Sequence, residues 1–137
     1  MEQSLVAYRN ALSERTQDKH PIAWAITQNN LAAAMQALGE HEEDIGSLEA
    51  SIPVYEAALK VLTSNKVPLV WAVVSANRAS AMLALAGESD YLDLAESAGD
   101  EFKRIAELFE GTDYLTYQTA AQERANTARE LADSLQV

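Results

Sequence analysis

Two histidines and one run of carboxylates are the side chains of this sequence best suited to chemistry. His20 and His41 are the only histidines. No second histidine lies three or four residues from either one, and neither belongs to a clear ligand pattern of a helical metal site. We interpret both as solvated loop residues, with adventitious copper or zinc at His41 as the alternative. The sequence therefore predicts no metal centre and no cofactor.

The carboxylates of Glu40, Glu42, Glu43 and Asp44 lack the alternating positions and central glycine of a calcium loop. Acid–base catalysis requires carboxylates in contrasting environments inside a cleft, and these residues have the pattern of an exposed helix start, where the helix dipole favours negative charge. The sequence has no nucleophile motif or phosphate-binding glycine loop. It also has no cysteine, which excludes thiol catalysis and disulfides. We therefore predict that the protein is not an enzyme.

Charge and composition narrow the classes of partner. The 137 residues include 21 acidic and 10 basic side chains, and the formal net charge is -11. Such an acidic protein is a poor match for nucleic acid or an anionic membrane. The N-terminus does not resemble a signal peptide, and we expect no apolar run to approach the length of a membrane span. We expect an acidic, cytoplasmic protein that binds neither nucleic acid nor membrane.

The sequence repeats with a period of 47 residues. Pro21, Trp24 and Asn30 return as Pro68, Trp71 and Asn77. Aligned without gaps, residues 5–38 and 52–85 share 14 identities in 34 positions. A repeat of this length in a chain with helical patterning indicates stacked helix pairs.

Apolar spacings of three and four residues predict six helices, at residues 2–15, 21–38, 45–62, 68–85, 89–110 and 114–135. Pro21 and Pro68 suit the first turn of a helix. We expect Gly39, Gly87 and Gly111 to follow helix ends, the last of them before a cap at Thr112 and Asp113. Pro53 predicts a kink or a break near Ala50.

The repeated motif resembles the tetratricopeptide repeat (TPR) family, in a bacterial variety whose long units begin with Pro-x-x-Trp-Ala. The matching residues are Pro21-x-x-Trp24-Ala25, Thr27 to Leu31, Leu38-Gly39-Glu40 and Tyr55-x-x-Ala58-Leu59. The resemblance implies an all-α fold of about six helices, in antiparallel pairs stacked as a short right-handed superhelix. It implies one domain over residues 1–137, with a partial unit at 2–15, units at 21–63 and 68–110, and a capping helix at 113–136. A helical bundle without a repeat superhelix is the alternative.

Most of the repeated side chains are expected to pack in the core. They are Tyr8, Trp24, Leu31, Met35, Leu38, Tyr55, Leu59, Trp71, Met82, Leu85 and Phe102. Tyr91, Tyr114 and Tyr117 fall outside the repeat phase, so they are better candidates for exposed contacts. The copies differ at other positions, and Leu31 of the first corresponds to Arg78 of the second.

Six polar residues are the candidate partner-binding residues of the concave face: Asn30, Gln36, Asn77, Arg78, Ser80 and Arg124. Asparagine has a lower helix propensity than alanine. Its recurrence at the same position of both repeats therefore indicates a structural or binding role. In related tetratricopeptide proteins the equivalent asparagine can bind a peptide backbone, whereas the structural alternative is a hydrogen bond to a neighbouring helix. Arg78 can similarly pair with an acidic ligand, or form an internal ion pair and extend its stem over apolar surface.

The function that this resemblance implies is non-catalytic binding of a protein or peptide on the concave helical face. A structural role as a homo-oligomer, such as a homodimer, is the alternative. A helical domain that binds a small ligand is a remote third hypothesis, which would require a closed apolar pocket with convergent polar groups.

Overall fold

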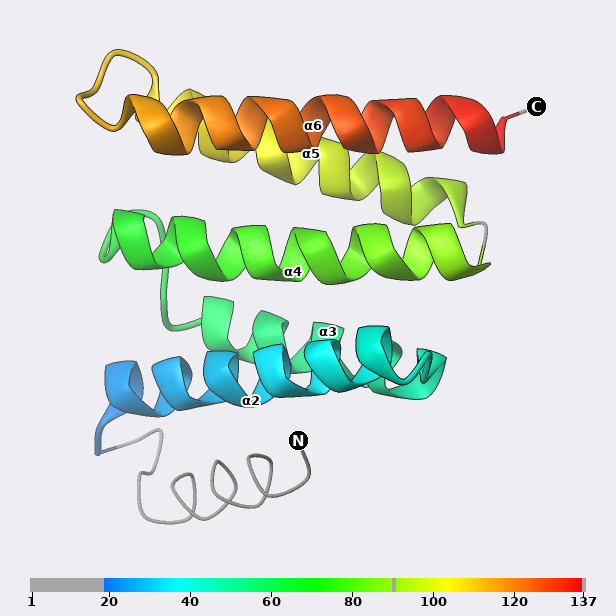
Figure 1. The fold of residues 1–137 in the computed structure, drawn as a ribbon. Helices are drawn as coiled ribbons and strands as arrows, with labels where there is room; N and C mark the ends of the chain where they lie inside the picture. Colours follow the sequence, from blue (N-terminus) through cyan, green and yellow to red (C-terminus); the bar gives the residue numbers. More distant parts are fainter. Residues whose placement is uncertain (1–18, 90, 137) are drawn as a thin grey trace. The chain divides into compact units, whose positions relative to one another are not determined.

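The computed structural model describes residues 19–89 and 91–136, and this part of the chain is helical with no strand (Figure 1). Its helices are α2 (Pro21–His41), α3 (Ile45–Leu59), α4 (Pro68–Ser89), α5 (Leu92–Phe109) and α6 (Leu115–Leu135). The all-α class is therefore confirmed. The described residues hold five helices where about six were expected for the whole chain, and the expected helix at 2–15 lies outside them.

The chain divides into two compact units whose boundary falls between Ala81 and Met82, inside α4. We call the described residues before this boundary unit 1 and those after it unit 2, and each is described by itself. Unit 1 contains α2, α3 and the first part of α4. Unit 2 contains the last part of α4 together with α5 and α6.

In unit 1, α2 and α3 form an antiparallel pair (Figure 1). Both α2 and α4 begin with a proline, whose missing N–H costs nothing in the first helical turn. The buried cluster of this unit joins three helices and the loop that follows α3. Its members are Ala25, Ala32, Tyr55, Ala58, Leu62, Val74 and Ala81. Alanines of α2 and α4 pack in this cluster together with the Tyr55 ring.

Gly39 does not end its helix as predicted, because α2 continues to His41. Gly39 is buried, and a Cβ atom there would lie 2.8 Å from the Leu48 backbone nitrogen and 2.9 Å from the Asp44 carbonyl oxygen. Such distances are far below van der Waals contact, so this glycine allows the start of α3 to pack against α2. The residue with positive φ after the helix is Glu43, at 55°.

The acidic run is also divided differently from the prediction. Glu40 belongs to α2 and Glu42 caps its C-terminus, so only Asp44 serves the start of α3. The Asp44 carboxylate accepts hydrogen bonds from the backbone N–H and the hydroxyl of Ser47, at 3.3 and 2.9 Å. This is the normal role of an aspartate N-cap. Helix α3 then runs through Pro53 without a break and ends at Leu59, three residues earlier than predicted.

In unit 2, α5 and α6 lie side by side in opposite directions (Figure 1). Gly87 lies inside α4, which ends two residues later, so its predicted role as a helix end is wrong. Gly111 does follow the end of α5 and has a φ of 76°, as a glycine after a C-cap requires. Thr112 accepts a hydrogen bond from the N–H of Tyr114, whereas Asp113 makes no cap, and Tyr114 is the N-cap of α6.

The residues expected in the core fall into two groups in the structure. Leu31, Tyr55, Met82, Leu85 and Phe102 are buried. Trp24, Met35, Leu38, Leu59 and Trp71 are partly buried. Tyr8 lies outside the described residues. Partial burial of both tryptophans is consistent with their size, since large indole rings are seldom covered completely.

One described helix contradicts the expectation that no apolar run is long enough for a membrane span. Residues Pro68–Glu88 of α4 meet the length and composition for one, and an 18-residue window within them has a mean hydropathy of 1.5. Of the residues in that window, 44% are buried inside the protein. The helix contains many alanines and only one charged residue, Arg78, before Glu88. A core helix of this composition passes the same test.

Candidate functional site

The repeated asparagines have different surroundings in the two copies. Asn30 is exposed on α2. Asn77 is partly buried on α4, and its amide nitrogen donates a hydrogen bond to the side-chain oxygen of Asn29, at 3.2 Å. Asn77 therefore joins α2 to α4, which is the structural alternative considered for it, while Asn30 keeps a side chain free to meet solvent or a partner.

Gln36 is part of a hydrogen-bonded chain that joins α2 to α3. The Tyr55 hydroxyl donates to the Gln36 side-chain oxygen at 2.7 Å, and the Gln36 amide nitrogen donates to the Glu40 carboxylate at 3.1 Å. Burial of the Tyr55 side chain, together with the nearby charge of Glu40, raises the pKa of its phenol well above its ordinary value. Gln36 thus satisfies a buried hydroxyl.

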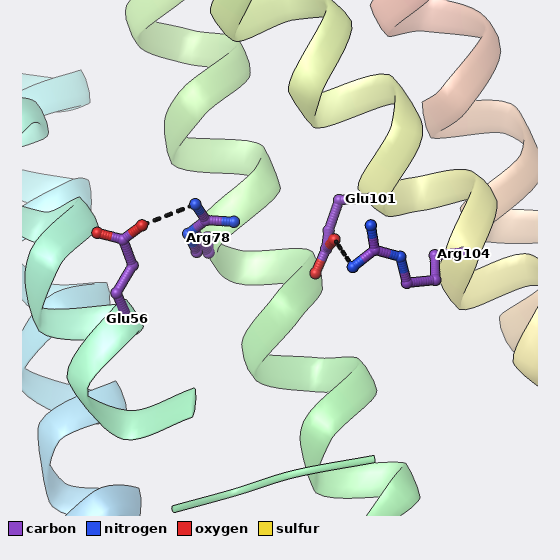
Figure 2. Close-up of polar contacts among 4 residues, drawn as sticks. All are labelled: Glu56, Arg78, Glu101 and Arg104. Atoms are coloured by element: carbon purple, nitrogen blue, oxygen red, sulfur yellow. Dashed lines mark hydrogen bonds and ion pairs between the residues drawn. The ribbon is translucent and has the colours of Figure 1, made fainter. Parts of the chain in front are cut away.

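Arg78 forms an ion pair with Glu56 of α3, with 2.7 Å between its guanidinium nitrogen and the carboxylate oxygen (Figure 2). The Arg78 side chain is 23% exposed and that of Glu56 is 48% exposed. Its Nε atom is buried and has no hydrogen-bond partner in the described part of the chain. The Arg78 guanidinium and the Glu56 carboxylate are therefore paired with each other within unit 1.

The six candidate residues do not gather at one place within a unit. Ser80 is partly buried on α4 and belongs to unit 1 with Asn30, Gln36, Asn77 and Arg78. Arg124 is exposed on α6 and belongs to unit 2. Among the candidates in unit 1, Asn30 alone is exposed, and the others are partly buried.

The structure shows instead an exposed set of branched apolar side chains in unit 1, which the sequence reasoning missed. Ile22 and Ile26 of α2 are 47% and 38% exposed, and Leu69 and Val73 of α4 are 43% and 50% exposed. We call these four residues the apolar face. The signal was present in the repeat, because Ile22 and Ile26 correspond to Leu69 and Val73 after 47 residues.

A hydrogen bond within unit 1 links the two helices that carry the apolar face. In each helix the exposed pair is four residues apart, on one side of the helix. Ile26 precedes Asn29 by three residues and Val73 precedes Asn77 by four, so one end of each exposed pair lies about one helical turn from the Asn29–Asn77 hydrogen bond. Residues 21–39 contain no charged side chain, and neither do residues 67–77. The helical stretches that carry the apolar face are therefore uncharged, and the charges that precede them along the chain are Lys19 and Lys66.

Three aromatic rings cluster where the chain turns from α5 to α6. The rings of Phe109, Tyr114 and Tyr117 pack in a triangle with centroids 5.6 to 6.1 Å apart. Phe109 is buried, and the two tyrosines are exposed, as is Tyr91. The rings fill the space between them, so this cluster stabilises the turn and leaves no cage for a ligand.

The described residues offer little for metal chemistry. His20 and His41 are both exposed. No group of three or more His, Cys, Asp or Glu side chains in residues 19–89 and 91–136 is arranged to hold a metal ion.

Comparison of the chain with protein-family models, with curated proteins and with solved structures found no match. The resemblance to tetratricopeptide repeats therefore stays a prediction from the repeated residues.

Proposed function

We propose that the protein is a non-catalytic module that binds a protein or peptide partner through the apolar face of unit 1. The observation that carries this proposal is the exposure of Ile22, Ile26, Leu69 and Val73 at repeat-equivalent positions of two uncharged helical stretches. Contiguous exposed apolar residues mark interaction sites in proteins. Depletion of charge is also typical of the centre of a protein interface.

The polar neighbours of this face support a partner that also carries hydrogen-bonding groups. Asn30 lies one turn beyond Ile26 and is exposed. The partly buried Asn29–Asn77 pair lies beside it. An apolar centre with amides at its margin suits a peptide that inserts apolar side chains and hydrogen-bonds through its backbone.

The finer architecture belongs to the same proposal. We infer that the helix pairs stack as a tetratricopeptide-like right-handed superhelix, which would place the apolar face on the concave side. The support is the repeat of 47 residues and the shared phase of α2 and α4.

The test is partner capture with the full chain and with the double variant Ile26→Glu/Val73→Glu. Proteins captured by the wild-type chain are identified by mass spectrometry, and direct binding of each purified candidate is measured by calorimetry. We expect the double variant to bind at least about tenfold more weakly, because two charges would be desolvated at the interface. Its melting temperature should stay close to that of the wild type, because both side chains already face solvent.

The matched control is Leu115→Glu, which changes a side chain that is 66% exposed in unit 2. This variant should bind the partner as the wild type does. Equal loss of binding in both variants would contradict a site on the apolar face. Light scattering across a dilution series decides whether a second copy is the occupant, since a dimer that the double variant dissociates would show self-association instead.

A further inference from the structure

A groove runs between α5 and α6 in unit 2, and it shares no residue with the apolar face. Its volume is about 770 Å³, within the range of ordinary ligand-binding clefts. The floor consists of small side chains from both helices. They are Ala95, Gly99, Ala106, Ala125 and Ala132. Because these side chains are small, the backbone of an occupant can come close to the floor. Any large apolar side chain in the groove must then come from the occupant.

The two rims of this α5–α6 groove differ in chemistry. The α5 rim is mainly acidic, and its residues are Glu96, Asp100, Lys103, Glu107 and Glu110. The α6 rim is mainly amide, and its residues are Gln118, Gln122, Asn126, Arg129, Asp133 and Gln136. Within the described residues, the ion pairs are Arg78–Glu56 and Arg104–Glu101 (Figure 2), so the rim carboxylates have no cationic partner there.

The charge around the groove favours an occupant that carries positive charge. Residues 82–137 contain twelve of the 21 acidic side chains and four of the 10 basic ones. The four carboxylates of the α5 rim outnumber its one lysine, Lys103, and a cationic partner would offset the excess negative charge. Complementary charge of this kind steers association and sets orientation.

The spacing of the rim residues indicates the shape of the occupant. The acidic positions of α5 recur at helical intervals from Glu96 to Glu110, a length of about 21 Å at 1.5 Å per residue. A second helix laid in the groove would present its own side chains at the same intervals. We propose that the α5–α6 groove binds an amphipathic basic helix of a partner protein, with its apolar face on the alanine and glycine floor and its Lys or Arg residues along the α5 rim.

A second copy of this chain is a poor occupant of the groove. Each described helix carries at most two Lys or Arg residues, and α2 and α3 carry none. None of them therefore supplies a basic flank. The occupant is a different protein that docks by the helix-in-groove mode.

The test uses the full chain and a labelled synthetic helix of about 18 residues, with leucines at helical spacing on one face and lysines on the flanks. Fluorescence anisotropy measures its affinity, and amide chemical shifts of the protein locate the contact. We expect the largest shifts at Gly99, Ala106 and Ala125. A control helix with glutamate in place of every lysine should not bind.

Two charge-reversal variants separate the groove from the net charge of the chain. Glu96→Lys/Asp100→Lys/Glu107→Lys changes the α5 rim, and we expect it to weaken binding by at least about tenfold. Asp93→Lys/Glu123→Lys/Glu130→Lys makes the same charge change at exposed carboxylates of unit 2 that do not line the groove. This control should weaken binding by less than about threefold, since screened charges beyond the contact act weakly.

Circular dichroism checks that both triple variants fold, and all six side chains are exposed. Equal losses in both variants would mean that only the overall charge attracts the peptide. Chemical shifts confined to unit 1, or no binding of the lysine helix by the wild-type chain, would also overturn the proposal.

Discussion

At the scale of single residues, the buried Tyr55 hydroxyl makes the stability of the fold depend on pH. The ring is fully buried, and its hydroxyl donates to Gln36. Since the pKa of the phenol is raised in the folded protein, the folded state holds its proton more tightly than the unfolded state does. Stability from this group is complete below the ordinary tyrosine pKa of about 10 and is lost as the pH rises above it.

We therefore predict that the free energy of unfolding falls above about pH 10, by up to about 1.4 kcal/mol per pH unit from this group. Tyr55→Phe should remove this part of the slope, at the cost of leaving the Gln36 amide oxygen without its donor. The measurement is urea unfolding at several pH values between about 8 and 11 for both proteins. Parallel curves would show that Tyr55 is not the group responsible.

The position of Arg78 in the repeat could be recognised from the sequence, but its ion-pair partner could not. Its place on the apolar stripe was visible from the alignment with Leu31, and an internal ion pair was one of the two readings considered. The partner, Glu56, could not be chosen among the acidic residues from the sequence. Which carboxylate comes within reach depends on how α3 packs against α4, and that is a property of the assembled helices.

At the scale of helices, two glycines in similar sequence positions have opposite roles. Gly39 lies where a Cβ atom would meet the backbone of α3, whereas a Cβ atom at Gly87 of α4 would meet nothing within 4 Å. Both residues are inside helices. The same substitution should therefore change stability in opposite directions.

We predict that Gly39→Ala destabilises the protein by about 1–3 kcal/mol, because α3 must move to admit the methyl group. Gly87→Ala should stabilise it by about 0.5–1 kcal/mol, because alanine is the better helix former. Thermal or urea unfolding of the two variants measures both changes. A stabilising Gly39→Ala would show that the start of α3 is not held against α2.

The sequence predicted where the helices lie better than where they end. Pro21 and Pro68 were correctly placed at helix starts, and Gly111 after a helix end, because those roles depend on local backbone geometry. Gly39 and Gly87 were wrongly placed, because a glycine inside a helix has the same appearance in a sequence as one that ends it, whether it allows close packing, as Gly39 does, or faces open space, as Gly87 does. The apolar face and the α5–α6 groove were missed for a related reason. Exposure of Ile26 or Val73 depends on which helices pack together, and periodicity alone does not specify that.

At the scale of the whole molecule, charge is distributed unevenly along the chain. The net charge is -11, and twelve of the 21 acidic residues lie within residues 82–137. Self-repulsion of this kind opposes folding at low ionic strength. The described ion pairs are few and partly exposed, so they offset little of it.

We predict that the melting temperature rises as sodium chloride is increased from about 10 mM to about 150 mM, because the Debye length falls from about 30 to about 8 Å. The variant Asp93→Lys/Glu123→Lys/Glu130→Lys should show a smaller rise, since it carries less negative charge. Scanning calorimetry at a series of salt concentrations gives both slopes. A melting temperature that falls with salt would mean that attractive pairs outweigh the repulsion.

The placement of the two tryptophans has a spectroscopic consequence. Trp24 and Trp71 are the only ones in the chain, and both belong to unit 1. Tryptophan emission therefore reports the environment of one unit, whereas far-ultraviolet dichroism also weighs the helices of the other. Superposed unfolding curves from the two signals would indicate that the chain melts as one cooperative body. Separate midpoints would resolve the two units with no added label, and would show which one loses its structure first.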